Sequence, residues 1–316
     1  MAEKKPKVGG QAVIEGVMMR GPKLVATAVR QPDGNIAVDV DTVNSLQDRY
    51  PILKKPFLRG VVVLYESLVM GIRAISYSAK MAGEEDEQLT DKEMYMTIAV
   101  AFLLAGVLFV AIPTGSAKLF DGFTSDPVCL NLLEGGVRLI VFLAYIFAIS
   151  RMKDIRRVFQ YHGAEHKTIF CYEAGLPLTV ENAQKFERLH PRCGTAFLLV
   201  VMLVSIFVFA FLGWPELWLR ILSRLILLPA VAGISYEFIR LAADSSNALI
   251  HAAILPGLWL QYLTTRPPED DMLEVAIESL KAVLPPEEIL PGAGEYLRGE
   301  GLAVQIAGGD GEVPRA

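Results

Sequence analysis

The sequence predicts a mainly α-helical, polytopic membrane protein: a bundle of four spans, with a fifth left open, a small N-terminal β element and a helical cytosolic loop. The 316 residues are 53% apolar and only 21% charged, with a mean hydropathy of +0.39. This composition is too apolar for an ordinary soluble domain. Two long stretches carry no charge, and the basic residues gather in one loop. Together these observations predict the fold class.

Residues 1–54 are expected to form a cytosolic segment that contains a β hairpin. Two β-branched runs, at 24–30 and 36–43, are separated by Gln-Pro-Asp-Gly-Asn, and an Asp-Gly pair between such runs is typical of a tight hairpin turn. The first residues, MAEKKPKVGGQAV, contain no apolar segment of signal-peptide length, so no export is expected.

Residues 55–82 are expected to form a membrane-associated helix. The segment is apolar around most of the helix, and its charges recur every seven residues, at Arg59, Glu66, Arg73 and Lys80. This spacing places them on one narrow stripe. A helix with such a stripe is typical of packing on a membrane or against a bundle.

The membrane bundle is expected over residues 94–266, with spans near 95–115, 130–150, 194–213 and 217–240. The first and third spans lie in uncharged stretches of 24 and 23 residues, long enough to cross an apolar layer of about 30 Å. The other two spans carry charges mostly near their ends, where long side chains can reach the interface. The uncharged stretch 245–265 is interpreted as interfacial or re-entrant, or as a fifth span.

The distribution of basic residues predicts the orientation. The loop 151–193 contains eight Lys and Arg, whereas residues 115–130 contain one. Basic loops stay in the cytosol, so both termini and this loop are expected there. The tail, 267–316, is expected to form a short helix and then a mobile segment. The net charge of −5 gives no indication of nucleic-acid binding, and none is expected.

Histidines cluster in the basic loop. Three of the four in the chain, His162, His166 and His190, fall within 29 residues. On a helix, His162 and His166 lie one turn apart, the spacing at which two imidazoles share a metal, and Glu165 beside them is placed to take a proton from a water molecule. This is the H-x-x-E-H pattern of inverted zincins.

His190 and Cys193 follow in the turn His-Pro-Arg-Cys-Gly, which leads into the third span. The four side chains His162, His166, His190 and Cys193 are therefore predicted to form a metal site at the cytosolic membrane surface. Nitrogen and sulfur ligands favour zinc, or another divalent transition metal. Glu237 is an alternative acidic ligand, or an ion-pair partner of Arg240. The alternative is that the histidines are polar surface residues and Cys193 is only a small residue at the start of a helix.

Five long motifs carry a family resemblance: GGQAVIEGVMMRGP, YHGAEHKTIFCYE, HPRCGTAFLL, GISYEFIRL and LPGLWLQYLTTRPPEDDMLEVAIESL. Through them the chain, from Val8 to about Val283, resembles the YqhQ-like family of bacterial membrane proteins, described as predicted metal-dependent enzymes. The resemblance implies a protein of the bacterial inner membrane in which His162, Glu165, His166, His190 and Cys193 occupy the family's motif positions.

Two functions remain open from the sequence. The first is a membrane-embedded, metal-dependent hydrolase that uses Glu165 as the catalytic base and acts on a membrane-associated substrate. The second is a non-catalytic scaffold in which a structural metal pins the loop to the spans, or holds a protein partner. Four protein ligands would close the coordination sphere, whereas a catalytic zinc keeps one position open. A transporter has less support, because no internal repeat is apparent.

Overall fold

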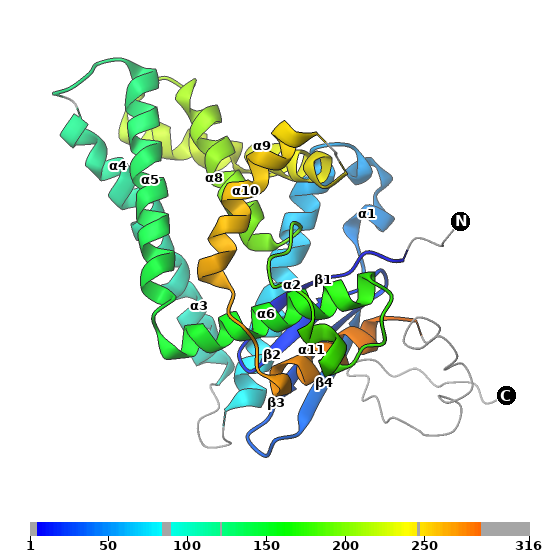
Figure 1. Cartoon of the computed structure of the whole chain (residues 1–316). Helices are drawn as coiled ribbons and strands as arrows, with labels where there is room; N and C mark the ends of the chain where they lie inside the picture. The colour runs from blue at the N-terminus through cyan, green and yellow to red at the C-terminus, as the bar shows by residue number, and fades with distance from the viewer. Residues whose placement is uncertain (1–4, 84–89, 121, 245–246, 286–316) are drawn as a thin grey trace, which may run out of the picture.

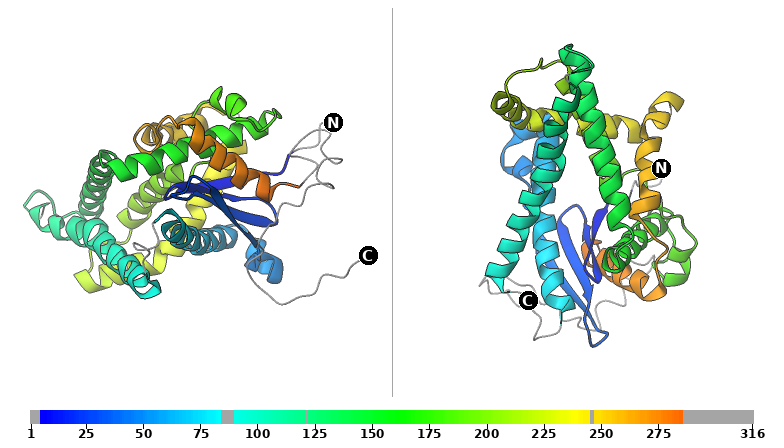
Figure 2. Two further views of the ribbon diagram at one scale, coloured as in Figure 1. Left: turned by 90° about the horizontal axis from the view of Figure 1, so that it is seen from below. Right: turned by 90° about the vertical axis from the view of Figure 1, so that its left-hand side faces the viewer.

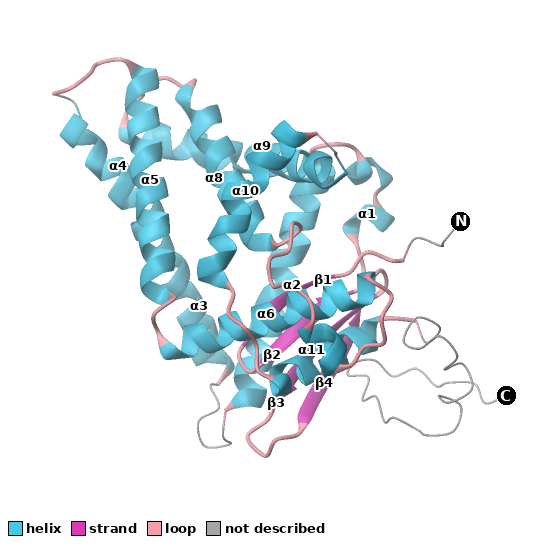
Figure 3. Cartoon of the chain, in the orientation of Figure 1, coloured by secondary structure: helices cyan, strands magenta, loops and turns pink. Residues whose placement is uncertain are grey.

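The structure is a computed structural model that describes residues 5–83, 90–120, 122–244 and 247–285. Long apolar helices form one part of the molecule, and a small sheet with its covering helices forms the other (Figure 1). Strands and the helices α6 and α11 gather at one end of the bundle (Figure 3). The mainly helical class with a small N-terminal β element is confirmed. The predicted mobile part of the tail, from residue 286, lies outside the described residues.

The sheet has four antiparallel strands in the order β1-β2-β3-β4. The predicted hairpin is present as β3 (Leu24–Arg30) and β4 (Ile36–Thr42), and Gly34 takes the positive φ of 87° that its turn requires. Two further strands, β1 (Gly9–Val13) and β2 (Gly16–Arg20), form a hairpin that we did not predict.

Strand β2 is covered on both faces of the sheet, which explains why it gave no alternating pattern. Val17 and Met19 of β2 pack toward α6 (Lys153–Glu173) and α11 (Asp270–Val283). Met18 points to the opposite face, toward α2 (Leu58–Ala82). The sequence of a strand that is buried on both faces is a continuous run of apolar residues, without the alternation of apolar and polar residues found in a half-exposed strand.

Three helical segments are long and apolar enough to cross a membrane: Lys92–Ser116, Pro127–Ile149 and Leu217–Ala242. The first comprises α3 (Asp91–Gly106), the π-helical turn η3 (Val107–Ala111) and α4 (Ile112–Ser116). The second is α5 (Pro127–Ile149), and the third lies in α9 (Leu217–Asp244). The apolar helix α8 (Gly194–Ala210) has only 17 residues. Three of the four predicted spans are therefore long enough.

The direction of α9 differs from that of the other apolar helices. Figure 2 shows α9 running crosswise to α5 in both views. One membrane normal cannot be parallel to both helices, a relation that hydropathy alone does not reveal. The stretch predicted as interfacial or as a fifth span forms α10 (Ala248–Thr264), which contains Pro256.

The two parts of the molecule are joined by several elements. The C-terminal half of α2 packs on the sheet through Ala74 and Met70, while its N-terminal end meets α9, where a Cβ on Gly60 would lie 2.7 Å from Tyr236. The remaining short elements are α1 (Leu46–Arg49), η1 (Pro51–Lys54), η4 (Ala117–Phe120) and α7 (Val180–Gln184). Helix α2 therefore contacts both the sheet and the bundle.

Candidate metal centre

Helix α6 supplies the first two residues of the candidate site. It lies along the sheet at the end of the bundle (Figure 1), and His162 and His166 stand one turn apart on it, with ring centroids 4.4 Å apart. His166 is fully buried, whereas His162 is partly exposed. Burial lowers the pKa of His166, which favours the neutral imidazole that metals bind.

Backbone carbonyls hold both imidazoles in one tautomer. His162 Nδ1 donates to the Thr264 carbonyl at 2.8 Å, at the end of α10, and His166 Nδ1 donates to the Arg188 carbonyl. Because each Nδ1 carries the proton, each Nε2 presents a lone pair. The Nε2 of His166 is buried and has no hydrogen-bond partner among the residues that the structure describes. This is how ligating histidines are oriented in metal sites.

Cys193 brings a third donor atom to these nitrogens. Its sulfur lies 3.2 Å from His162 Nε2, and one donor atom from each of Cys193, His162 and His166 lies within 4.8 Å of the others. Cys193 is the N-cap of α8, and its sulfur accepts a hydrogen bond from the Thr195 backbone at 3.4 Å. The positive end of the α8 dipole therefore lies beside the sulfur.

The structure does not bring His190 into this group. Its ring lies beside that of His166, with centroids 5.4 Å apart. Its Nδ1 accepts a hydrogen bond from the Arg192 backbone at 3.2 Å, and its Nε2 lies 3.9 Å from the Glu173 carboxylate. Its backbone is held by Gln261 of α10 through two hydrogen bonds of 2.8 Å. His190 therefore lies next to the three donors and contacts the ring of His166, one of the candidate ligands.

Glu165 lies between α6 and strand β1. Its side chain fills the space beside Gly10, where an added Cβ would come within 2.9 Å of the Glu165 Cγ, and it accepts a hydrogen bond from the Gly10 backbone. Burial raises the pKa of Glu165 to about 7, against the opposing effects of His162 and the Gly10 N–H. A carboxyl group with a pKa near 7 is suited to exchange protons at neutral pH.

The donor set of two imidazole nitrogens and one sulfur fits a borderline divalent metal such as zinc. All three donors converge, and the two nitrogens are already oriented by their backbone partners. The partly exposed His162 keeps one side of the group accessible. These features match a three-ligand site with room for a further ligand.

Several supporting contacts were not predicted. The carbonyls of Thr264 and Arg188, and the side chain of Gln261, approach the histidines from elsewhere in the chain, so local spacing could not indicate them. Gly10 was also not predicted, although the glycine pair Gly9 and Gly10 in the first motif could have indicated a close backbone contact, since Gly10 lies against Glu165.

Glu15 and Arg20, both in the first sequence motif, pair with residues of different helices. Glu15 contacts Arg157 of α6, and Arg20 pairs with Glu66 of α2 at 3.0 Å. Glu15 lies in the β1–β2 turn, at a positive φ of 50°, while Arg20 ends β2, so they occupy opposite ends of one strand.

Glu237 pairs with a residue of another helix. Its carboxylate accepts a hydrogen bond of 2.7 Å from Arg59 Nε of α2, in place of the predicted ion pair with Arg240. The contact joins α2 to α9, and no described contact joins Glu237 to the candidate metal ligands. The pair therefore serves helix packing.

The comparisons with known proteins identify the family. Residues 55–286 match the family model described as "Protein of unknown function (DUF1385)". The chain is 40% identical over 296 residues to the "Uncharacterized protein YqhQ" of Bacillus subtilis (strain 168), covering 88% of this chain and 92% of that protein. No solved structure was found to match. The chain therefore belongs to the DUF1385 family of YqhQ-like proteins, as its motifs predicted.

Proposed function

We propose that this chain is a membrane-embedded, zinc-dependent hydrolase that acts on a membrane-associated substrate. The observation that carries the proposal is the convergence of His162 Nε2, His166 Nε2 and the Cys193 sulfur, with each Nδ1 held by a backbone carbonyl. Nitrogen and sulfur donors arranged in this way are what zinc requires. The proposal rests on this geometry together with the chemistry of the donor set.

The number of converging donors supports a catalytic site over a closed structural one. Three protein ligands leave one position of a tetrahedral zinc for a water molecule or substrate, whereas structural sites use four. Within the described residues, the group of converging donors contains His162, His166 and Cys193, and His190 lies outside it. A zinc ion held there would supply Lewis acidity toward a water molecule and a scissile bond.

Glu165 is the proposed general base. It is adjacent in sequence to His166 and interacts electrostatically with His162, so it lies beside the donors. In the proposed reaction Glu165 accepts a proton as water attacks the substrate, and returns it to the leaving group as the bond breaks. The Gly10 backbone N–H would hold the carboxylate in position during both steps.

The position of the site supports a membrane-associated substrate. Cys193 begins α8 and Thr264 ends α10, so the donors lie where two apolar helices meet the sheet layer. An ester, a peptide or a phosphoester that is attached to the bilayer could reach such a position. The eight basic residues of the loop 151–193 support a cytosolic location for this layer, with both termini on the same side. The relative from Bacillus subtilis supports a bacterial origin, and the three long apolar helical segments of this chain support a place in the cell membrane.

A structural metal site is the second candidate function, and the placement of His190 favours it. Its ring lies next to that of His166, and its Nε2 is buried without a hydrogen-bond partner in the described part of the chain. A rotation of this ring toward the three donors would supply a fourth ligand. The metal would then fasten α6, the turn before α8 and the end of α10 together.

Metal analysis of detergent-purified protein tests the proposal. We expect about one zinc ion per chain in the wild type, and loss of that zinc in His162→Ala and in Cys193→Ser. Cys171→Ser is the matched control, because Cys171 is a buried thiol on α6 that lies outside the group of donors and whose sulfur donates to the Pro177 carbonyl. Wild-type protein without stoichiometric metal would contradict both candidate functions.

Glu165→Gln then separates catalysis from structure. If the site is catalytic, this variant keeps its zinc and loses turnover of any substrate that the wild type hydrolyses. If the site is structural, the variant keeps both its zinc and its membrane assembly. Loss of zinc in Glu165→Gln would show that the carboxylate itself is a ligand, which neither version includes.

A further inference from the structure

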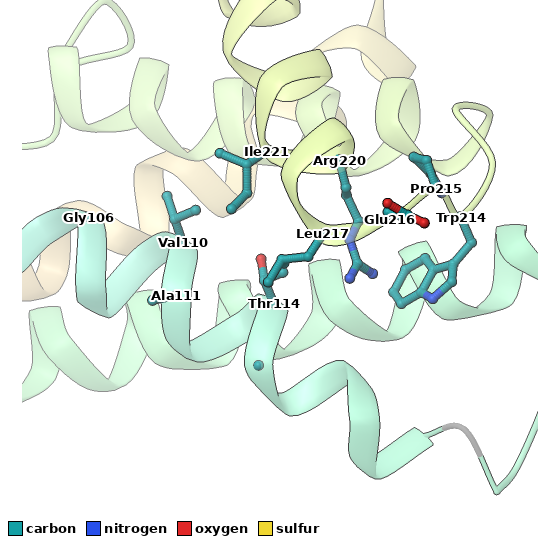
Figure 4. A pocket seen from close by; sticks show the side chains of 11 residues that line it. Gly106, Val110, Ala111, Thr114, Trp214, Pro215, Glu216, Leu217, Arg220 and Ile221 are labelled. Atoms are coloured by element: carbon teal, nitrogen blue, oxygen red, sulfur yellow. The ribbon is translucent and has the colours of Figure 1, made fainter.

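Two groups of arginines lie outside the candidate metal centre, and they differ in their partners. In the bundle, Arg138 and Arg224 pair with the buried carboxylate of Glu134, beside a cavity of about 700 Å³ at the turn between α8 and α9 (Figure 4). The second group, called the arginine cluster below, lies by α6. None of its members forms an ion pair with a carboxylate of the described residues: Arg151, Arg156, Arg188 and Arg266.

The fold attaches two members of the arginine cluster to α6 through their backbones. Arg266, after α10, donates its N–H to the Phe159 carbonyl at 2.8 Å, and a Cβ on Gly163 would lie 2.1 Å from the Arg266 carbonyl oxygen. One turn further along α6, His166 Nδ1 donates to the Arg188 carbonyl. Arg266 and Arg188 are therefore fixed to the helix that carries the candidate ligands, although they lie far from it in sequence.

The guanidinium groups of the arginine cluster repel one another. Burial lowers the pKa of Arg266, and so do the positive charges of its three neighbours, Arg188, Arg156 and Arg151. Burial also lowers the pKa of Lys167, and the charge of Arg188 lowers it further. The Nε of Arg188 is buried and has no hydrogen-bond partner in the described part of the chain. A bound anion would relieve this repulsion and give the buried Nε an acceptor.

Exposed aromatic residues place the arginine cluster at the edge of the apolar layer. The Phe147 ring, near the end of α5, has its centroid 4.6 Å from the Arg151 guanidinium. Tyr262, near the end of α10, accepts a hydrogen bond of 2.6 Å from Arg266 through its carbonyl. Helices α5 and α10 pack together in the bundle. Aromatic and basic side chains gather where membrane helices meet water, so an anion bound here could be attached to the bilayer.

We propose that the arginine cluster binds the phosphate group of a membrane-anchored molecule, beside the candidate metal centre. This inference rests on the proposed function, because that molecule would be the substrate of the hydrolase. Guanidinium groups donate paired hydrogen bonds to phosphate oxygens, and basic pockets between membrane helices recognise lipid headgroups. The carbonyl of Arg188 orients His166, and Arg266 closely follows Thr264, whose carbonyl orients His162. The cluster thus favours a phosphate-bearing lipid over a neutral ester or a peptide.

Calorimetric titration of detergent-purified protein, at constant detergent concentration, tests the proposal. Dioctanoyl phosphatidic acid carries a phosphate on a lipid anchor. Dioctanoylglycerol has the same anchor without the phosphate, and glycerol 3-phosphate has the phosphate without the acyl chains. We expect phosphatidic acid to bind about tenfold or more tightly than either of the other two, since one charge-assisted hydrogen bond contributes about this factor.

Two variants and a matched control locate the site. Arg188→Gln and Arg266→Gln each remove one guanidinium group and keep the backbone groups that contact α6. We expect each to weaken the binding of phosphatidic acid about tenfold, with no change for dioctanoylglycerol. Lys185→Gln is the control, because Lys185 is an exposed cation of the same loop and pairs with Glu181 at 3.5 Å. It removes the same charge and should leave the binding unchanged.

The zinc content of the same samples separates this inference from the proposed function. Equal binding of phosphatidic acid and dioctanoylglycerol by protein that carries zinc would overturn the phosphate site and leave the hydrolase untouched. A preference for phosphatidic acid in protein without zinc would support the phosphate site and contradict the hydrolase.

Two further results would overturn the proposal. If Lys185→Gln weakens binding as much as Arg188→Gln does, the loop attracts anions through its net charge and the arginine cluster is not a site. If glycerol 3-phosphate binds as tightly as phosphatidic acid, the cluster takes a soluble phosphate, and the assignment to a membrane-anchored molecule is wrong.

Discussion

The two polar clusters of this protein, one at α6 and one inside the bundle, are satisfied in opposite ways. Around Glu134, arginine, threonine and asparagine side chains hydrogen-bond to one another across three helices. At α6, the Nδ1 atoms of His162 and His166 donate to backbone carbonyls. The remaining ring nitrogens and the Cys193 sulfur face one another, and each of them offers a lone pair. The first cluster holds its helices together through its own charges. In the second, three donor atoms converge, and the proposed metal site rests on this arrangement.

This comparison predicts that the largest loss of stability follows from breaking the bundle cluster. Glu134→Gln removes the carboxylate that three arginines share. We expect the free energy of unfolding to fall by about 3–5 kcal/mol, because the guanidinium groups stay buried without their counter-charge. Thermal or denaturant unfolding in detergent measures the change. Metal content per folded chain should stay at the wild-type value.

Glu237→Gln is the matched control for this substitution. Glu237 is also paired with an arginine, but both side chains are partly exposed, so water can replace the lost contact. Its effect should be clearly smaller than that of Glu134→Gln. Equal losses in the two variants would mean that burial does not distinguish the two clusters.

The next largest effect is expected where α6 touches the segment after α10. A Cβ on Gly163 would lie 2.1 Å from the Arg266 carbonyl oxygen, and the backbone cannot move away freely because Arg266 N donates to the Phe159 carbonyl at 2.8 Å. Gly163→Ala should cost about 3 kcal/mol of stability. It should also weaken metal binding, because the same segment carries the Thr264 carbonyl that orients His162.

Gly136→Ala provides the control for Gly163→Ala. A Cβ on this helical glycine of α5 meets no atom within 4 Å, so the change should be neutral or stabilising by up to about 1 kcal/mol. Metal titration of the two purified variants separates the effects. Unchanged metal affinity in a folded Gly163→Ala protein would contradict the role given to the Thr264 carbonyl.

The same contrast explains how far the sequence alone could predict this molecule. Hydropathy and turn residues act over short distances, so the long apolar segments and the hairpin of β3 and β4 were predictable. The helical spacing of His162 and His166 also predicted their proximity. Cys193 lies beside them as expected, although it follows His166 by 27 residues. The turn before α8 is held against α10 by the hydrogen bond from His190 N to Gln261, and the end of α10 also contacts α6.

What could not be predicted depends on long-range packing. Strand β2 is buried on both faces, so it shows no alternation, and the turn before it places Glu15, which is not a glycine, at a positive φ. The pairing of Glu134 with Arg224 joins residues 90 positions apart. The crosswise direction of α9 follows from such contacts, and no property of its own residues indicates it.

A smaller effect, on position more than on stability, is expected at Gly10. A Cβ there would lie 2.7 Å from the Met18 carbonyl oxygen and 2.9 Å from the Glu165 Cγ. Gly10→Ala should cost about 1–2 kcal/mol and displace the Glu165 carboxylate while the metal ligands stay in place. Metal content should therefore be retained and any hydrolysis reduced. The neighbouring Gly9, with no atom within 4 Å of an added Cβ, is the control, since Gly9→Ala should change neither property.

The smallest effect on metal binding is expected at His190, and it sharpens the distinction between an open and a closed site. His190→Asn keeps the backbone hydrogen bonds with Gln261 and removes the ring that lies beside His166. If three donors hold the metal, the variant retains about one zinc ion per chain. Its zinc affinity then falls by at most about tenfold, the smallest loss expected when a residue that contacts a metal ligand is replaced. If His190 is a fourth ligand, the zinc is lost as it is in Cys193→Ser. Zinc content at matched free metal concentrations therefore decides between the hydrolase and the scaffold.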